Sequence, residues 1–179
     1  GLPLNMSELQ PNNDEATRYA FVVVGSGRGT RGESLADPID RNGFWLAGVR
    51  IYDSLRQMGF EAKNMRFLFS TGDPDFTDTL EARAIAELQS EQFNNTYDNK
   101  ATEANINIQL KRFAGFVDSN DIFVMYIGTH GSPNSFELEA DGYFGNWTVQ
   151  EVQKNIGRIN PGFGALYSDA CHSGAFIKQ

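Results

Sequence analysis

The sequence predicts an α/β protein with a mainly parallel β-sheet. Short apolar runs alternate along the chain with longer segments whose apolar residues recur at helical spacing. Glycine, proline and polar clusters separate the two kinds of segment. We expect residues 19–179 to form one domain. Residues 1–18 are polar and carry two prolines, which indicates a leader or edge segment.

Four segments are predicted to be buried strands, because each is short, almost entirely apolar and bounded by glycine or polar residues. They are residues 19–25 (YAFVVVG), 65–70 (MRFLFS), 121–128 (DIFVMYIG) and, approximately, 165–169 (ALYSD). Residues 136–144 (FELEADGYF) carry Asp-Gly at their centre, which predicts a β-hairpin.

Four further segments are predicted to be helices. Residues 44–58 have apolar residues at helical spacing, and Gly59 closes this helix. The next helix ends near residue 89, and the last two cover residues 103–117 and 149–157. Their expected N-terminal caps are, in order, Asp78 with Glu81, Thr102, and Thr148 with Glu151.

The composition excludes several classes of protein. The formal net charge is −8 and no Lys/Arg cluster stands out, which argues against nucleic acid and anionic membranes as partners. No apolar run approaches the ~18–20 residues of a membrane helix, and the first residues show no signal peptide. We expect a soluble protein and leave its compartment open. The one cysteine excludes an internal disulfide and a cysteine-based zinc site.

Three glycine-rich segments follow predicted strands, and ligands bind at the carboxyl ends of strands in open parallel sheets. Two of these segments, GTHGSP and DACHSG, hold His130 and Cys171, a candidate base and nucleophile. A nearby His favours the reactive thiolate, and a protonated His can donate a proton to a leaving amine. Gly131 and Gly174 leave room for a substrate backbone. A lone buried Cys is usually inert, but the joint placement at strand ends favours catalysis.

The segments FVMYIGTHGSP (123–133) and ALYSDACHSGAF (165–176) together resemble the His-Gly and Asp-x-Cys-x-x-Gly motifs of the caspase-hemoglobinase superfamily of cysteine peptidases. Caspases, metacaspases, legumains, clostripain and gingipains belong to it. The resemblance covers most of the chain in layout and implies a three-layer sandwich with a mainly parallel sheet flanked by helices. Residues 19–179 would be the large-subunit-like portion of a peptidase domain. DACHSG is most similar to metacaspases and YIGTHGSP to legumains, so the subfamily stays open.

The resemblance implies a role for each residue of the two motifs. Cys171 would be the nucleophile that forms a thioester, and His130 the general acid and base. The backbone N–H groups of Gly131 and Cys171 would form the oxyanion hole. Asp169 would line the specificity pocket. His172 stands at a position that varies within the superfamily and would have no catalytic role.

Asp169 predicts cleavage after Arg or Lys, because a buried carboxylate is costly unless a cation pairs with it. The resemblance to metacaspases implies the same preference for Arg or Lys. Legumains have an acidic residue at the position of Asp169 and cleave after Asn. Asn is therefore the second candidate for the residue before the scissile bond. The Arg-His pair of legumains is replaced by Phe44 and Trp45, which argues against the Asn preference. The alternative is that Asp169 only accepts backbone hydrogen bonds at the strand end.

The stretch GSGRGTRG (25–32) lacks the features of a nucleotide site. Thr30 stands where a dinucleotide fingerprint needs glycine, and no Gly-Lys-Ser/Thr follows. In the superfamily this loop borders the substrate pocket, so Arg28 or Arg31 is a candidate substrate contact. A solvated arginine is the alternative reading.

An acidic turn holds Asp73, Asp75 and Asp78. Some metacaspases depend on calcium, but these spacings do not match an EF-hand. Helix capping is the better interpretation, and we expect no cofactor.

The chain ends at Gln179, soon after Cys171, whereas the superfamily fold continues with further strands. We expect a product of proteolytic maturation or a shortened chain, in which a second polypeptide (a small subunit) completes the sheet, since exposed edge strands aggregate. Two other functions stay open. One is a catalytically silent scaffold of the same fold, and the other is a flavodoxin-like module that binds an anion.

Overall fold

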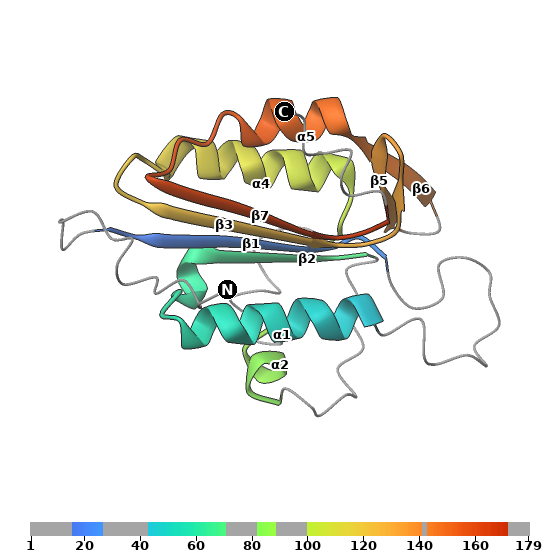
Figure 1. Ribbon diagram of the computed structural model, residues 1–179. Coiled ribbons are helices and arrows are strands. Elements are labelled where there is room, and N and C mark those ends of the chain that lie inside the picture. Colours follow the sequence, from blue (N-terminus) through green and yellow to red (C-terminus); the bar gives the residue numbers. More distant parts are fainter. Residues whose placement is uncertain (1–15, 27–42, 71–81, 89–99, 141–142, 172–179) are drawn as a thin grey trace, which may run out of the picture.

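The computed structural model describes residues 16–26, 43–70, 82–88, 100–140 and 143–171. At its centre lies a four-stranded sheet with the order β2-β1-β3-β7 (Figure 1). These strands are β1 (Arg18–Val24), β2 (Met65–Phe69), β3 (Ile122–Gly128) and β7 (Phe163–Asp169). Every neighbouring pair is parallel, so the predicted class is confirmed.

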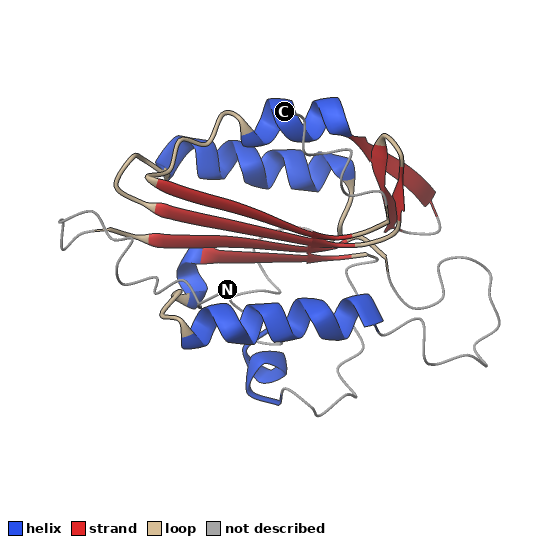
Figure 2. Ribbon diagram, viewed as in Figure 1, coloured by secondary structure: helices blue, strands red, loops and turns tan. Residues whose placement is uncertain are grey.

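Helices cover both faces of this sheet and give three layers (Figures 1 and 2). One face carries α1 (Gly43–Gln57) and α2 (Ala82–Leu88), and the other carries α4 (Glu103–Phe116) and α5 (Val149–Ile156). A short 3-10 helix, η2 (Ala62–Asn64), leads into β2 and was not predicted. None of the helices in the described ranges is long and apolar enough to cross a membrane.

The central strands are apolar throughout because both of their faces are buried. Successive side chains of a strand point to opposite faces. Ala20, Val22 and Val24 of β1 therefore pack in the cluster under α1, whereas Phe21 and Val23 pack in the cluster under α4. This two-sided burial explains why β1 and β3 could be recognised from uninterrupted apolar runs. The prediction that the fourth strand is buried is wrong, because every residue of β7 is half-buried or exposed.

A second, antiparallel sheet stands at the carboxyl-terminal end of the first (Figure 2). Its strands are β4 (Gly131–Ser132), β5 (Ser135–Ala140) and β6 (Tyr143–Thr148). The β5–β6 hairpin was predicted, but the two-residue strand β4 carries no sequence signal. Trp147 is fully buried and its indole N–H donates to Asn107 of α4 over 3.2 Å, which fixes the hairpin to the helical layer.

Most predicted helix ends are confirmed. Thr102 caps α4, and Thr148 with Glu151 forms a capping box on α5. Gly59 ends α1 with a φ of +88°, in the left-handed region that favours glycine. The predicted cap of α2, Asp78 with Glu81, lies outside the described residues.

Strand β7 begins two residues earlier than predicted. Its first residue, Phe163, pairs with Ile122 at the start of β3, and the N–H of Phe163 donates to the Asp121 carbonyl. The ladder therefore extends along the whole of β3, and pairing rather than apolar content sets where β7 starts.

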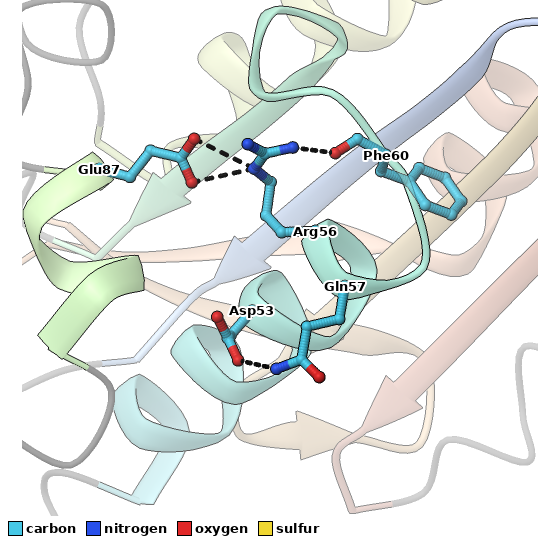
Figure 3. A network of polar contacts seen from close by, with 5 residues as sticks. All are labelled: Asp53, Arg56, Gln57, Phe60 and Glu87. Carbon is cyan, nitrogen blue, oxygen red and sulfur yellow. Dashed lines mark hydrogen bonds and ion pairs between the residues drawn. The ribbon is translucent and has the colours of Figure 1, made fainter.

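A polar network joins α2 to the end of α1 (Figure 3). The Arg56 guanidinium donates to both carboxylate oxygens of Glu87 over 2.9 and 3.1 Å and also to the Phe60 carbonyl. The hydrogen bond to Glu87 raises the pKa of Arg56. Along α1, the Gln57 amide donates to the Asp53 carboxylate. The Arg56–Glu87 ion pair thus connects α2 to α1, whereas the other two contacts stabilise the end of α1 itself.

Candidate functional site

The register of β3 and β7 places His130 and Cys171 at the same edge of the sheet. Gly128 ends β3 opposite Asp169, the last residue of β7. The next N–H, that of Thr129, donates to the Asp169 carbonyl over 3.1 Å. His130 and Cys171 each follow two residues after the ends of these paired strands. Both residues therefore lie at the carboxyl ends of the parallel strands, although a hairpin and a helix separate them in sequence.

Gly131 is in direct contact with the cysteine segment. A Cβ atom built on Gly131 would lie 2.1 Å from the carbonyl oxygen of Cys171 and 3.2 Å from the Cβ of Ala170. No side chain fits in that gap, so the main chains of the two segments touch only because residue 131 is glycine. The sequence analysis expected Gly131 to leave room for a substrate backbone, but the space beside it is taken by the main chain of Cys171.

The two predicted reactive side chains differ in exposure. Cys171 is a free thiol, and the residue is exposed to solvent. His130 is half-buried. Its ring stands edge-to-face with the ring of Phe44, with 5.1 Å between ring centroids and 83° between the ring planes.

Phe44 was not predicted to belong to the site. It entered the sequence analysis only as the residue that replaces an Arg-His pair of legumains. It lies in the first turn of α1, which brings the helical layer on that face of the sheet up to the histidine. Its apolar character alone indicated a core residue, so the sequence held no signal for this contact.

The main chain next to His130 is hydrogen-bonded to, and closely packed against, the neighbouring strands. Thr129 is fully buried, and its hydroxyl donates to the Glu137 carbonyl of β5. Gly25, which follows β1, donates its N–H to the Gly128 carbonyl over 2.9 Å. A Cβ on Gly25 would lie 2.7 Å from the Thr129 hydroxyl oxygen. The ends of β1, β3 and β5 therefore pack tightly beneath the candidate site.

Asp169 lies at the end of β7 and is exposed. Phe163 and Ala165 of the same strand pack against the cluster under α1, so alternation places the Asp169 side chain on that face as well. Its neighbour there is the buried Tyr126, whose hydroxyl lies beside Gly128, the cross-strand partner of Asp169. Burial raises the pKa of Tyr126, and the Asp169 carboxylate adds to the rise. The hydrogen bond to the Asp169 carbonyl involves the main chain and does not engage the carboxylate.

Several predicted residues lie outside the described ranges. They are Arg28, Arg31, His172, Gly174 and the acidic turn with Asp73, Asp75 and Asp78. Within the described ranges, no group of three or more His, Cys, Asp or Glu residues is arranged to hold a metal ion.

Comparison of the sequence with models of known protein families gave no match, and comparison with curated protein sequences gave none either. Function must therefore be inferred from this chain's own residues and their geometry.

Proposed function

We propose that the protein is a cysteine endopeptidase in which Cys171 is the nucleophile and His130 the general acid and base. The observation that carries the proposal is the contact between Gly131 and the Cys171 carbonyl, which brings the His-Gly and Cys segments together at the carboxyl-terminal edge of the sheet. The exposed thiol adds support, because a structural cysteine is usually buried.

The proposed reaction has two steps. The Cys171 thiolate attacks the carbonyl carbon of the scissile peptide bond, and His130 gives a proton to the amine as the C–N bond breaks. A thioester remains. A water molecule then loses a proton to His130 and attacks the thioester, which releases the carboxylic acid and restores the thiolate.

The oxyanion hole is assigned to the main-chain N–H groups of Gly131 and Cys171. One detail supports the first of these. The N–H of Glu137 donates to the His130 carbonyl over 2.9 Å, and Gly131 is paired with Phe136. In an antiparallel ladder this makes Gly131 and Phe136 a non-hydrogen-bonded pair, so the N–H of Gly131 points away from β5.

Asp169 is proposed to select Arg or Lys before the scissile bond, with Asn as the second choice. A substrate cation would pair with the carboxylate, whereas a substrate Asp would meet like charge. Asp169 is exposed in this chain, so the buried carboxylate expected from the sequence is not found, and the proposed preference for Arg or Lys depends on charge complementarity alone.

A second polypeptide is proposed to pair with β7 and complete the sheet. In the part of the chain that the structure describes, β7 has one neighbouring strand, β3. Leu166 and Tyr167 of β7 are 40% and 58% exposed. A groove of about 350 Å³ beside β7, lined by Phe123, Ile156 and Leu166 among others, offers a seat for apolar side chains of an added strand.

Peptide cleavage tests the proposal. A library that varies the residue before the scissile bond should be cleaved after Arg or Lys by the wild-type protein and not by Cys171→Ala or His130→Ala. A chloromethyl ketone that carries Arg should modify Cys171, which mass spectrometry can assign without ambiguity because the chain has one cysteine.

Two results would argue for other functions. Turnover that survives in Cys171→Ala would exclude the mechanism. A thiol that reacts with simple alkylating reagents, in a protein that cleaves no peptide, would favour a catalytically silent scaffold. The contact between the His-Gly and Cys segments already weighs against a flavodoxin-like anion module, for which these segments have no joint role.

A further inference from the structure

The space beside Asp169 is taken by the hydroxyl group of Tyr126. Gly128 is the cross-strand partner of Asp169, and a Cβ on Gly128 would lie only 2.6 Å from the Tyr126 hydroxyl oxygen. The hydroxyl thus occupies the place where residue 128 would carry its side chain. Paired residues of neighbouring strands lie about 4.8 Å apart, so this position is directly next to the Asp169 side chain.

Tyr126 is poised to donate one hydrogen bond. It is 5% exposed, and among the described residues its hydroxyl has no hydrogen bond of standard geometry. A buried hydroxyl without a hydrogen-bond partner is costly, so a nearby acceptor would stabilise it. Burial raises the pKa of Tyr126 to about 12, and the Asp169 carboxylate adds to the rise. The phenol therefore keeps its proton near neutral pH and can act towards a carboxylate only as a donor.

Asp169 can complete this hydrogen bond by rotating its side chain, because it is exposed at the end of β7. The ring of Tyr126 cannot move to the same extent, since it is packed in the cluster under α1. In this hydrogen bond the Tyr126 ring keeps its position, and the Asp169 side chain rotates to meet it.

We propose that Tyr126 is a positioning residue for Asp169: its hydroxyl donates to one carboxylate oxygen and turns the other towards a cationic side chain of the substrate. The inference rests on the proposed function and deepens it, because it names the group that prepares the specificity pocket. Gly128 makes this arrangement possible, because the side chain of any larger residue would displace the Tyr126 hydroxyl.

The proposal predicts a loss confined to basic substrates. Tyr126→Phe removes the hydroxyl and keeps the buried ring. We expect KM for peptides with Arg before the scissile bond to rise about tenfold with kcat little changed, and both constants for Asn peptides to stay the same. Gly128→Ala should give a similar loss by displacing the hydroxyl. Tyr52→Phe is the matched control, because Tyr52 is a fully buried tyrosine of α1 that packs on Phe67 of β2.

A binding measurement separates this proposal from the proposed function. The probe is a fluorescent peptide that ends in Arg, added to Cys171→Ala protein so that no cleavage occurs. We expect Tyr126→Phe to weaken its binding about tenfold and Asp169→Asn to weaken it at least as much. If these binding losses are found but the wild-type protein, with Cys171 intact, cleaves no peptide, the positioning role stands and the peptidase is rejected.

Three outcomes would overturn the positioning role. They are unchanged binding of the Arg peptide in Tyr126→Phe, an equal loss for Arg and Asn peptides, and an equal loss in Tyr52→Phe. The last two would indicate general damage to the core and no effect on the Asp169 carboxylate. Absence of any binding by the parent Cys171→Ala protein would reject the cation site itself.

Discussion

Phe44 links the helical layer to the candidate catalytic residue. Its ring is half-buried at the start of α1 and packs on the cluster beneath that helix, and its other contact is the ring of His130. Aromatic pairs in this edge-to-face geometry contribute about 0.5–1.5 kcal/mol beyond the area that they bury. A half-buried imidazole has several accessible orientations, and this contact favours one of them.

We expect Phe44→Leu to lower kcat about tenfold with a smaller effect on KM, because a misplaced general base slows the chemical steps more than binding. Phe44→Tyr keeps the ring and should keep most of the activity. NMR of the histidine side chains gives a second readout, since the chain has two histidines and the Phe44 ring current should shift the His130 signals. Equal effects of Phe44→Leu and Phe116→Leu, on the opposite helical layer, would contradict this role.

At the scale of elements, the N-termini of α4 and α5 meet through two carboxyl groups. The pKa of Glu103, in the first turn of α4, is raised chiefly by the neighbouring Glu151 carboxyl group of α5 and also by burial. The pKa of Glu151 is lowered, chiefly by the hydroxyl of Thr148, whose main-chain N–H also donates to it. The pKa values of the two carboxyl groups are therefore shifted in opposite directions.

These two shifts have opposite effects on stability. The raised pKa of Glu103 contributes stability that is present below its unfolded pKa, about 4.3, and is lost as the pH rises through the folded value. The lowered pKa of Glu151 contributes stability that is present above the unfolded value and is lost as the pH falls through the folded one. At neutral pH, Glu151 stabilises the fold and ionised Glu103 opposes it.

Glu103→Gln should therefore raise the melting temperature at pH 7 by about 1–3 °C, because the amide can donate to Glu151 without adding a second charge. At pH 4 the gain should disappear, since Glu103 is then largely protonated in the wild-type protein. Thermal melts across this pH range provide the measurement. Glu61→Gln, on an exposed residue of the opposite layer, serves as the control and should not reproduce the pH dependence. A gain that is equal at both pH values would contradict the assignment.

At the scale of the whole molecule, the faces of the parallel sheet are covered but the β7 edge is not. Both faces are covered by helices, whereas the described part of the chain leaves the outer edge of β7 without a paired strand. Leu166 and Tyr167 stand on this strand with large exposed fractions. An exposed apolar edge strand is a template for pairing with another chain.

We expect the chain on its own to self-associate as its concentration rises and Tyr167→Lys to suppress this association, because a charge on an edge strand opposes strand pairing. Analytical ultracentrifugation measures both. Ile108→Lys is the matched control, since Ile108 is 50% exposed on α4 and away from any sheet edge. A wild-type chain that stays monomeric at high concentration, or an equal effect of both variants, would show that β7 is not the interacting surface.

The sequence alone predicted the elements whose signals are local. Apolar runs predicted β1, β2 and β3, because strands buried on both faces need few polar positions. The fourth strand, β7, was also predicted, although its residues are half-buried or exposed. Thr102, Thr148 with Glu151, and Gly59 predicted helix ends, because capping involves residues only a few positions apart. The candidate pair His130 and Cys171 also came from the sequence, through two motifs and the rule that parallel strands end at one edge.

Contacts between residues far apart in the chain were decided by the tertiary structure. No local sequence feature distinguishes Phe44 or Tyr126 from an ordinary core residue. In the structure, however, the Phe44 ring contacts His130, and the Tyr126 hydroxyl fills the space beside Gly128. These contacts depend on the β3–β7 register and on how α1 lies across the sheet. A local pattern determines which face of an element is buried, whereas its partner on that face is selected only when all the layers pack together.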